Sequence, residues 1–321
     1  MPKTRAILVI VRLNFYLLSV VYPFAGTRFL IGCEMDVDVS ALLPGALILA
    51  GAKRTMLAKV GDSVRTLVVG SSHGDFGFDP HHCPGAFNLC CRSQDLKHSF
   101  HLYRRLAGEL KNLDTVVVVY SVFSPGNDLE KSPSEREIAV ALNELFGLGI
   151  EYSDDYLRVL SGVMAGKNDA LEVEMEDGYY GFLPTYGKGY MPEAYWEGRV
   201  QGHLRLSRVD DGIVYLRQMI ALAQDLGHRL LVLIPPARSD YTATCMASTD
   251  NVFESLYQVL DELGIDKAQS VLNLFNDPRF ADSDFGDSDH LLPSGAGAVT
   301  LSTAVKDALD RMPTGPISSR P

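Results

Sequence analysis

The sequence predicts an α/β protein in which helices cover both faces of a mostly parallel β-sheet. Short, continuous apolar runs, such as TVVVVY at 115–120, are typical of strands that are buried on both faces. Segments with apolar residues at helical spacing alternate with these runs, as expected for β-strand and α-helix units. The chain of 321 residues is 46% hydrophobic and 21% charged, a composition that suits a globular protein with a sizeable core.

The first part of this alternation begins after residue 65. Residues 66–69 (TLVV) form a β-branched apolar run that ends at Gly70 and predicts a buried strand. Residues 86–89 are a weaker strand candidate. Residues 95–111 place apolar side chains at three- and four-residue spacings, which predicts an amphipathic helix. The run at 115–120 follows directly and is the clearest strand of the chain.

The same alternation returns after residue 209. It is predicted from apolar periodicity together with glycine, proline and capping residues at the boundaries. The expected elements are a helix over 213–226, a strand over 229–234, a helix over 251–263 capped by Asp250, a strand over 271–275 and a helix from Ser294 to about 311. In a parallel sheet of this kind, reactive residues are expected just after the carboxyl ends of the strands.

The domain organisation follows from where the alternation starts and stops. We expect an apolar N-terminal segment over 1–60, an α/β domain over 61–311 and a flexible tail over 312–321. Residues 151–205 break the alternation and predict an insertion between the two halves of the sheet. This insertion holds seven of the 14 tyrosines and the only tryptophan of the chain.

Aromatic residues of the insertion have two interpretations. Aromatic faces stack on sugar rings, so Tyr190, Tyr195 and Trp196 are candidates for binding a saccharide substrate. The alternative is that the aromatic side chains form a local core beneath a long loop. The sequence leaves both open.

The N-terminal segment is also open to two interpretations. Residues 6–26 are long enough to span a bilayer and follow a short basic start, but Arg12 and Asn14 interrupt the apolar run. They form either a membrane anchor or a helix packed on the domain, together with the apolar stretch 41–52. A cleaved signal peptide is disfavoured because no small-x-small cleavage site follows.

Charge and cysteine content exclude some partners and cofactors. The chain has 29 Lys and Arg against 40 Asp and Glu, a net charge of −11, and lacks the basic stripe that a nucleic-acid-binding protein needs. The five cysteines lack the paired spacing of a zinc site, and we expect reduced, buried thiols. No metal or other cofactor is expected.

Two motifs carry candidate chemistry at the predicted carboxyl edge of the sheet. Gly70-Ser71-Ser72 follows the first strand, where a glycine permits a tight turn that presents a serine hydroxyl. Asp287 and His290 lie three residues apart between the last strand and the last helix. An Asp at this spacing can hold Nδ1 of the imidazole and leave Nε2 to take a serine proton. Asp289 competes with Asp287 for this role.

These motifs resemble those of the SGNH/GDSL hydrolase superfamily, and in particular SGNH-like proteins encoded at bacterial envelope-polysaccharide O-acetylation loci. Ser72 matches the nucleophile of the first block, with Ser71 where the family has Asp, and Asp287 and His290 match the last block. The resemblance covers roughly 65–125 and 209–311. It implies a flavodoxin-like SGNH-hydrolase sandwich and a location in the cytoplasm or at the inner membrane.

The resemblance also implies an oxyanion hole, for which two blocks depart from the family pattern. The N–H of Ser72 is the first expected donor. The second block lacks its glycine, so we expect the N–H of Ser93 to act instead. Asn127, in a Gly-Asn-Asp sequence displaced from the end of the strand, is the third candidate, although turn formation explains these residues equally well.

The function implied by the resemblance is a serine-dependent O-acyl esterase or O-acetyltransferase acting on a polysaccharide or glycolipid. Ser72 would attack the acyl carbonyl, His290 would carry the proton, and Asp287 would orient His290. The alternative is a non-catalytic SGNH-like subunit that binds a glycan or a partner protein, which the two altered blocks favour. A generic lipase-like esterase is a third, weaker hypothesis.

Overall fold

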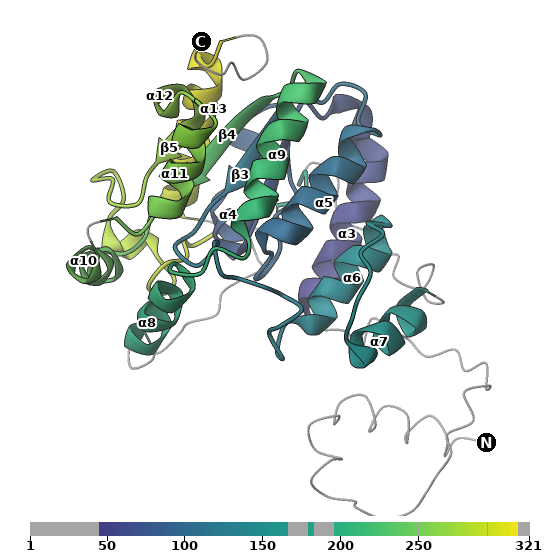
Figure 1. The fold of residues 1–321 in the computed structure, drawn as a ribbon. Helices are drawn as coiled ribbons and strands as arrows, with labels where there is room; N and C mark the ends of the chain where they lie inside the picture. Colours follow the sequence, from purple (N-terminus) through teal and green to yellow (C-terminus); the bar gives the residue numbers. More distant parts are fainter. Residues whose placement is uncertain (1–44, 166–178, 183–195, 250, 294, 314–321) are drawn as a thin grey trace, which may run out of the picture.

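A computed structural model describes residues 45–165, 179–182, 196–249, 251–293 and 295–313 (Figure 1). The predicted N-terminal anchor at 6–26 and the candidate substrate residues Tyr190 and Tyr195 lie outside these ranges. Among the helices within them, none combines the length and apolarity needed to cross a bilayer.

Five parallel strands form the central sheet, which confirms the predicted α/β class. The strands are β1 (Thr66–Gly70), β2 (Ala86–Asn88), β3 (Thr115–Val119), β4 (Arg229–Ile234) and β5 (Val271–Asn273). Their order is β2-β1-β3-β4-β5, and each neighbouring pair is parallel. This order is compatible with a flavodoxin-like fold. Each predicted apolar run therefore contains a strand.

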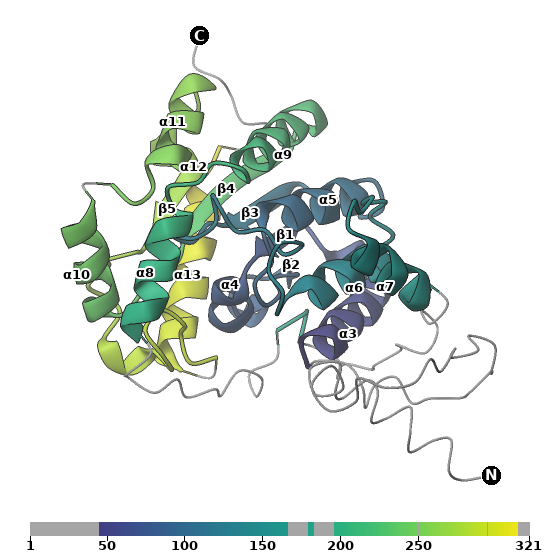
Figure 2. The ribbon, with the colours of Figure 1, turned by 60° about the horizontal axis from the view of Figure 1, so that its bottom comes forward.

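The helices cover this sheet, and they include more elements than the sequence predicted. They are α3 (Gly45–Val60), α4 (Ser72–Gly77), α5 (Leu96–Ala107), α6 (Arg136–Phe146), α7 (Asp155–Ala165), α8 (Trp196–Leu206), α9 (Ile213–Leu226), α10 (Ser239–Ser248), α11 (Glu254–Glu262), α12 (Lys267–Ser270) and α13 (Ala296–Arg311). Helices α5 and α9 pack side by side over one face of the sheet, whereas α4 and α13 lie on the other (Figures 1 and 2).

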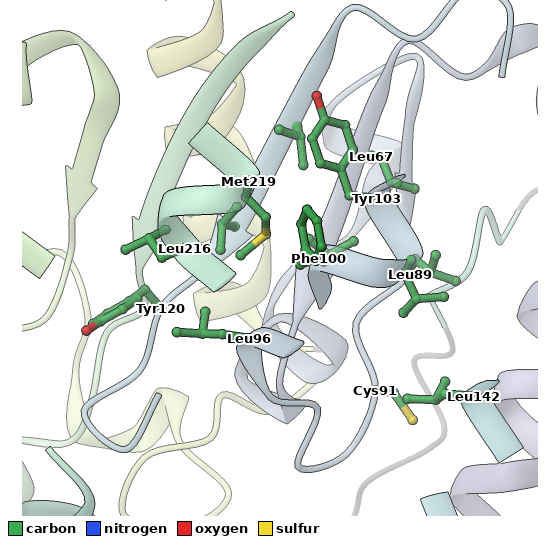
Figure 3. Packing of buried hydrophobic residues seen from close by; sticks show 14 of the residues in the cluster. Leu67, Leu89, Cys91, Leu96, Phe100, Tyr103, Tyr120, Leu142, Leu216 and Met219 are labelled. Carbon is green, nitrogen blue, oxygen red and sulfur yellow. The ribbon is translucent and has the colours of Figure 1, made fainter. Parts of the chain in front are cut away.

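Two hydrophobic cores lie on the two faces of the sheet because side chains alternate along each strand. Leu67 and Val69 of β1 join the larger core, while Val68 between them joins the smaller core against α13. Figure 3 shows Leu67 of β1, Phe100 of α5 and Met219 of α9 among the side chains of the larger core. The continuous apolar runs of the sequence thus reflect burial on both sides.

Two predicted helix starts are corrected by the structure. The helix expected from residue 251 begins only at Glu254, because the Asn251 side chain accepts the Phe253 N–H and forms a turn first. The last helix begins at Ala296 with Gly295 at its N-cap, and the expected cap Ser294 lies outside the described residues. Helices α4, α6, α7, α8, α10 and α12 were not predicted from the sequence.

Most of the described aromatic residues of 151–205 pack in the interior, whereas Tyr156 is exposed. Tyr152 is buried and donates a hydrogen bond to the Ala139 carbonyl at 3.1 Å. Tyr179, Tyr180 and Trp196 are partly buried and pack against the larger core. For these residues the local-core interpretation fits the structure, and a separate aromatic insertion is not confirmed.

The end of the predicted N-terminal segment packs within the α/β domain. Helix α3 lies against α6, and its apolar side chains, including Leu49 and Met56, are part of the larger core. The cysteines at 83, 90, 91 and 245 are buried and none of them forms a disulfide, in agreement with the prediction of reduced thiols, whereas Cys33 lies outside the described ranges.

Candidate active site

The candidate site lies at the carboxyl ends of β1 and β3, where the strand order changes direction. Chains leaving these two strands diverge, which opens a crevice in folds of this kind. Ser72 follows β1 as the first residue of α4, and Ser121 follows β3. The predicted nucleophile therefore sits at the topological switch point of the sheet.

Gly70 makes the turn between β1 and α4 possible. Its φ of +143° is a conformation that residues with a side chain rarely adopt. A Cβ at this position would lie 2.7 Å from the Val119 Cβ and 2.8 Å from the Val119 carbonyl oxygen. Glycine thus lets the end of β1 approach β3 closely while the chain turns to present Ser72.

The structure brings Ser72, His290 and Asp287 together in the order predicted from the sequence. Ser72 Oγ lies 2.7 Å from His290 Nε2, and His290 Nδ1 lies 2.8 Å from Asp287 Oδ2. The Asp287 Oδ1 atom also accepts the backbone N–H of His290 at 2.8 Å, which fixes the loop between them. This geometry leaves Nε2 facing the serine hydroxyl, as a general base requires.

Asp287 is ionised in this arrangement. Burial would raise the pKa of its carboxyl group, but the hydrogen bond and charge of His290 outweigh burial and lower the pKa below its ordinary value. An ionised Asp287 accepts the Nδ1 proton of His290 and would stabilise the imidazolium form.

Asp289, the competing aspartate, has other partners. Its Oδ1 lies 3.7 Å from His290 Nδ1 but 2.8 Å from Arg199 Nε. Its Oδ2 lies 3.0 Å from His73 Nε2. Burial would raise the pKa of Asp289, and the nearby Arg199 guanidinium instead holds it well below its usual range. Asp287 is therefore the closer partner of His290.

The three predicted oxyanion residues, Ser72, Ser93 and Asn127, line the same cavity. Among the described residues, no acceptor contacts the N–H of Ser72 or of Ser93. Ser93 adopts φ of +54°, the left-handed conformation that favours glycine. Asn127 Nδ2 donates to the Ser93 carbonyl at 2.8 Å and so holds this turn. All three predicted oxyanion residues thus meet at one site.

A cavity of about 500 Å³ opens above these residues. Its lining includes Ser72, Ser93, Asn127, Arg199, His203 and His290. The volume falls within the range of small-molecule sites. Trp196, a predicted substrate residue, does not line this cavity in the described part of the chain, and packs against the core instead.

Helix α8 supplies two site residues that the sequence did not reveal. Arg199 lies against Asp289 and His290, with Nη2 at 3.2 Å from His290 Nδ1. His203 lies one turn further along and contacts the Tyr241 hydroxyl at 2.8 Å through Nδ1. Burial lowers the pKa of His203 to about 3, so this ring is neutral. No local motif marks either residue.

Asp287, Asp289 and His290 offer donor atoms within 4.8 Å of one another, the spacing of a metal site. These atoms already bind each other, Arg199 and His73, and the guanidinium supplies the positive charge that balances Asp289. The donor set therefore suits proton transfer better than cation binding.

Comparison with known families adds no assignment: no protein-family model matches the chain, and no curated protein is detectably similar to it.

Proposed function

We propose that the chain is a serine-dependent O-acyl (acetyl) esterase or O-acetyltransferase that acts on a polysaccharide or glycolipid. One observation carries the proposal: Ser72, His290 and Asp287 form a continuous hydrogen-bonded series that ends in a cavity. A serine is a weak nucleophile unless a base is within hydrogen-bond reach, and His290 fulfils that condition.

In the first step, Ser72 Oγ attacks the carbonyl carbon of the acyl donor while His290 Nε2 takes the hydroxyl proton. Asp287 stabilises the resulting imidazolium. The carbonyl oxygen becomes an oxyanion, for which the N–H groups of Ser72 and Ser93 are donors. The intermediate then collapses, and the leaving alkoxide takes the proton from His290, which leaves an acyl-serine.

In the second step, a water molecule or a sugar hydroxyl attacks the acyl-serine. His290 accepts the proton of this nucleophile and returns a proton to Ser72 Oγ as the ester bond breaks. Water gives the free acid, and a sugar hydroxyl gives an acylated sugar. The two activities thus share one site and differ in how well the acceptor excludes water.

The glycan substrate class is supported by the sequence resemblance and by the position of α8. Since α8 carries Arg199 and His203 to the cavity, the residues that lead into α8 are proposed to bind the acceptor. Tyr190 and Tyr195 are the candidates, whereas Trp196 packs against the core. Replacement of either tyrosine by Ala is expected to weaken use of an oligosaccharide acceptor and to spare hydrolysis of a small acyl ester.

The nucleophile is tested with a fluorophosphonate serine probe. We expect covalent labelling of the wild-type protein, loss of labelling in Ser72→Ala and His290→Ala, and full labelling in the control Ser248→Ala, which changes an exposed serine on α10. A folded wild-type protein that stays unlabelled across neutral pH would favour the alternative, a non-catalytic subunit that binds a glycan or a partner.

The acceptor is tested by mass spectrometry of the products formed from an activated acetyl donor, with and without oligosaccharides. Acetylated sugar would establish a transferase, and free acetate alone would establish an esterase. If Tyr190→Ala and Tyr195→Ala reduce small-ester hydrolysis as much as glycan acetylation, these residues are structural and the glycan proposal loses this support.

A further inference from the structure

A second Asp–His pair lies directly behind the first. His73 follows Ser72 in α4, and its Nε2 lies 3.0 Å from Asp289 Oδ2. Its Nδ1 lies 3.1 Å from Ser71 Oγ and 3.0 Å from Ser121 Oγ. All four side chains of this arrangement are buried and none of them lines the cavity, so substrate does not reach them.

The ring of His73 supports the ring of His290. The two imidazoles are stacked, with centroids 4.6 Å apart and planes inclined by 18°. Phe123 contacts His73 with a centroid separation of 5.6 Å. The orientation of His290 is therefore set by Asp287 at its edge and by His73 at its face.

The partners of His73 select one tautomer. An ionised Asp289 only accepts hydrogen bonds, so His73 Nε2 must carry the proton between them. Nδ1 then offers a lone pair to the hydroxyl of Ser71 or Ser121, and these two hydroxyls lie 3.2 Å apart and can bond each other. A neutral His73 with its proton on Nε2 satisfies every polar atom of the group.

The charges around His73 agree with a neutral ring. The titratable groups that face it are Asp289, His290, Arg199 and His203, of which Asp289 is already balanced by Arg199. Burial, and next the charge of His290, lower the pKa of His73, while Asp289 opposes them.

We propose that His73 is a positioning residue for His290, and that it acts as a neutral imidazole with its proton on Nε2. This inference rests on the proposed function of Ser72 and His290. A neutral ring supports His290 without opposing the positive charge that His290 acquires when it takes the serine proton. It also holds Asp289, whose carboxylate lies 3.7 Å from His290 Nδ1.

The tautomer is tested by 15N nuclear magnetic resonance of the wild-type protein labelled at histidine. His73→Gln identifies the His73 signals, and His82→Gln, at a partly exposed histidine, serves as the assignment control. At neutral pH we expect protonation at Nε2 and none at Nδ1. A proton on Nδ1, or on both nitrogens, would overturn the proposal. This measurement does not depend on activity, so it is separate from a failure of probe labelling at Ser72.

The positioning role is tested by kinetics on a small acyl ester. His73→Ala is expected to lower kcat by about 10²-fold with little change in KM, since a displaced base is costly. His73→Gln keeps an N–H toward Asp289 and is expected to recover part of that loss. A His73→Ala protein with the kcat of His82→Gln would refute the role. If His73→Ala does not fold, the kcat of His73→Gln and the tautomer of His73 in the wild-type protein test the positioning role instead.

Discussion

Lys53 of α3 and Asp75 of α4 form an ion pair that is almost completely buried. The Lys53 Nζ atom lies 2.5 Å from Asp75 Oδ1 and 2.6 Å from the Cys90 carbonyl oxygen. The exposed fractions of the two side chains are 1% and 2%. Lys53 therefore joins three segments at once: its own helix, the helix that begins with Ser72, and the chain that leads to Ser93.

The first prediction concerns the stability that this ion pair contributes. Lys53→Met leaves the Asp75 carboxyl buried without its cation, and we expect the free energy of unfolding to fall by about 3–5 kcal/mol. Urea denaturation measures this change. The double variant Lys53→Met/Asp75→Leu should recover most of the loss, whereas Arg54→Met, at an exposed site on the same helix, should have little effect. Equal losses of unfolding free energy for Lys53→Met and Arg54→Met would contradict a stabilising ion pair between Lys53 and Asp75.

The second prediction separates the two aspartates near His290. Asp287→Asn favours the wrong tautomer of His290 and is expected to lower turnover by ~10⁴-fold. Asp289→Asn should lower turnover less but reduce the free energy of unfolding by about 3–5 kcal/mol, because Arg199 loses its buried partner. Ester hydrolysis and urea denaturation measure the two effects. A larger loss of turnover for Asp289→Asn would show that the pairing is reversed.

The third prediction concerns the oxyanion donors. Asn127→Ala removes the bond that holds the Ser93 turn and is expected to lower kcat, by at most the ~10²–10³-fold that loss of the Ser93 donor itself would cost. Ser93→Gly should retain activity, since the donor is a backbone N–H and glycine adopts positive φ without strain. Asn112→Ala is the matched control, because Asn112 donates in the same way to the Asp62 carbonyl on an exposed part of the chain. Equal kcat values for Asn127→Ala and Asn112→Ala would indicate that Asn127 forms only a turn and does not support the oxyanion donors.

The fourth prediction concerns acid stability. Burial lowers the pKa of His203 from 6.5 to about 3, so between these values the unfolded chain binds a proton that the folded chain does not. The contribution of His203 to the free energy of unfolding is therefore fully present above the pKa that this residue has in the unfolded chain, and it decreases as the pH falls. Between about pH 7 and pH 5 we expect this residue to lower the free energy of unfolding by about 2 kcal/mol.

Urea denaturation at a series of pH values measures this dependence. His203→Asn should reduce the fall in unfolding free energy by the same amount. His81→Asn, at a histidine whose side chain is 50% exposed, is the control and should leave the pH dependence unchanged. An identical pH dependence in the wild-type protein and His203→Asn would be incompatible with a neutral, buried His203.

The fifth prediction compares two glycines. At Gly70 a methyl group would collide with Val119, and the positive φ adds backbone strain, so Gly70→Ala should destabilise the protein by about 1–3 kcal/mol. At Gly162 of α7 a Cβ meets no atom within 4 Å, and Gly162→Ala should stabilise the helix by about 0.5–1 kcal/mol. Thermal unfolding measures both, and a shift of the same sign would be inconsistent with the structure.

Much of the fold and the central motifs could be predicted from the sequence. The apolar runs that became β1 to β4 are local patterns typical of strands buried on both faces, and the edge strand β5, which is only partly buried, follows a shorter run. Because parallel strands share one carboxyl edge, Ser72 after β1 and His290 after the last strand were expected at the same end of the sheet. The pairing of Asp287 with His290 could likewise be predicted, because the two residues are three positions apart in a single loop.

Only the tertiary structure decided the surroundings of these motifs. Arg199 and His203 enter the site from α8, and His73 turns inward to Asp289. Lys53 reaches Asp75 from a segment for which the sequence left open a membrane anchor or helices packed on the domain. Each of these contacts joins residues far apart in the chain. Local periodicity and spacing determine which residues form a strand, a helix or a turn, but which distant side chains balance a buried charge depends on how the helices pack against the sheet.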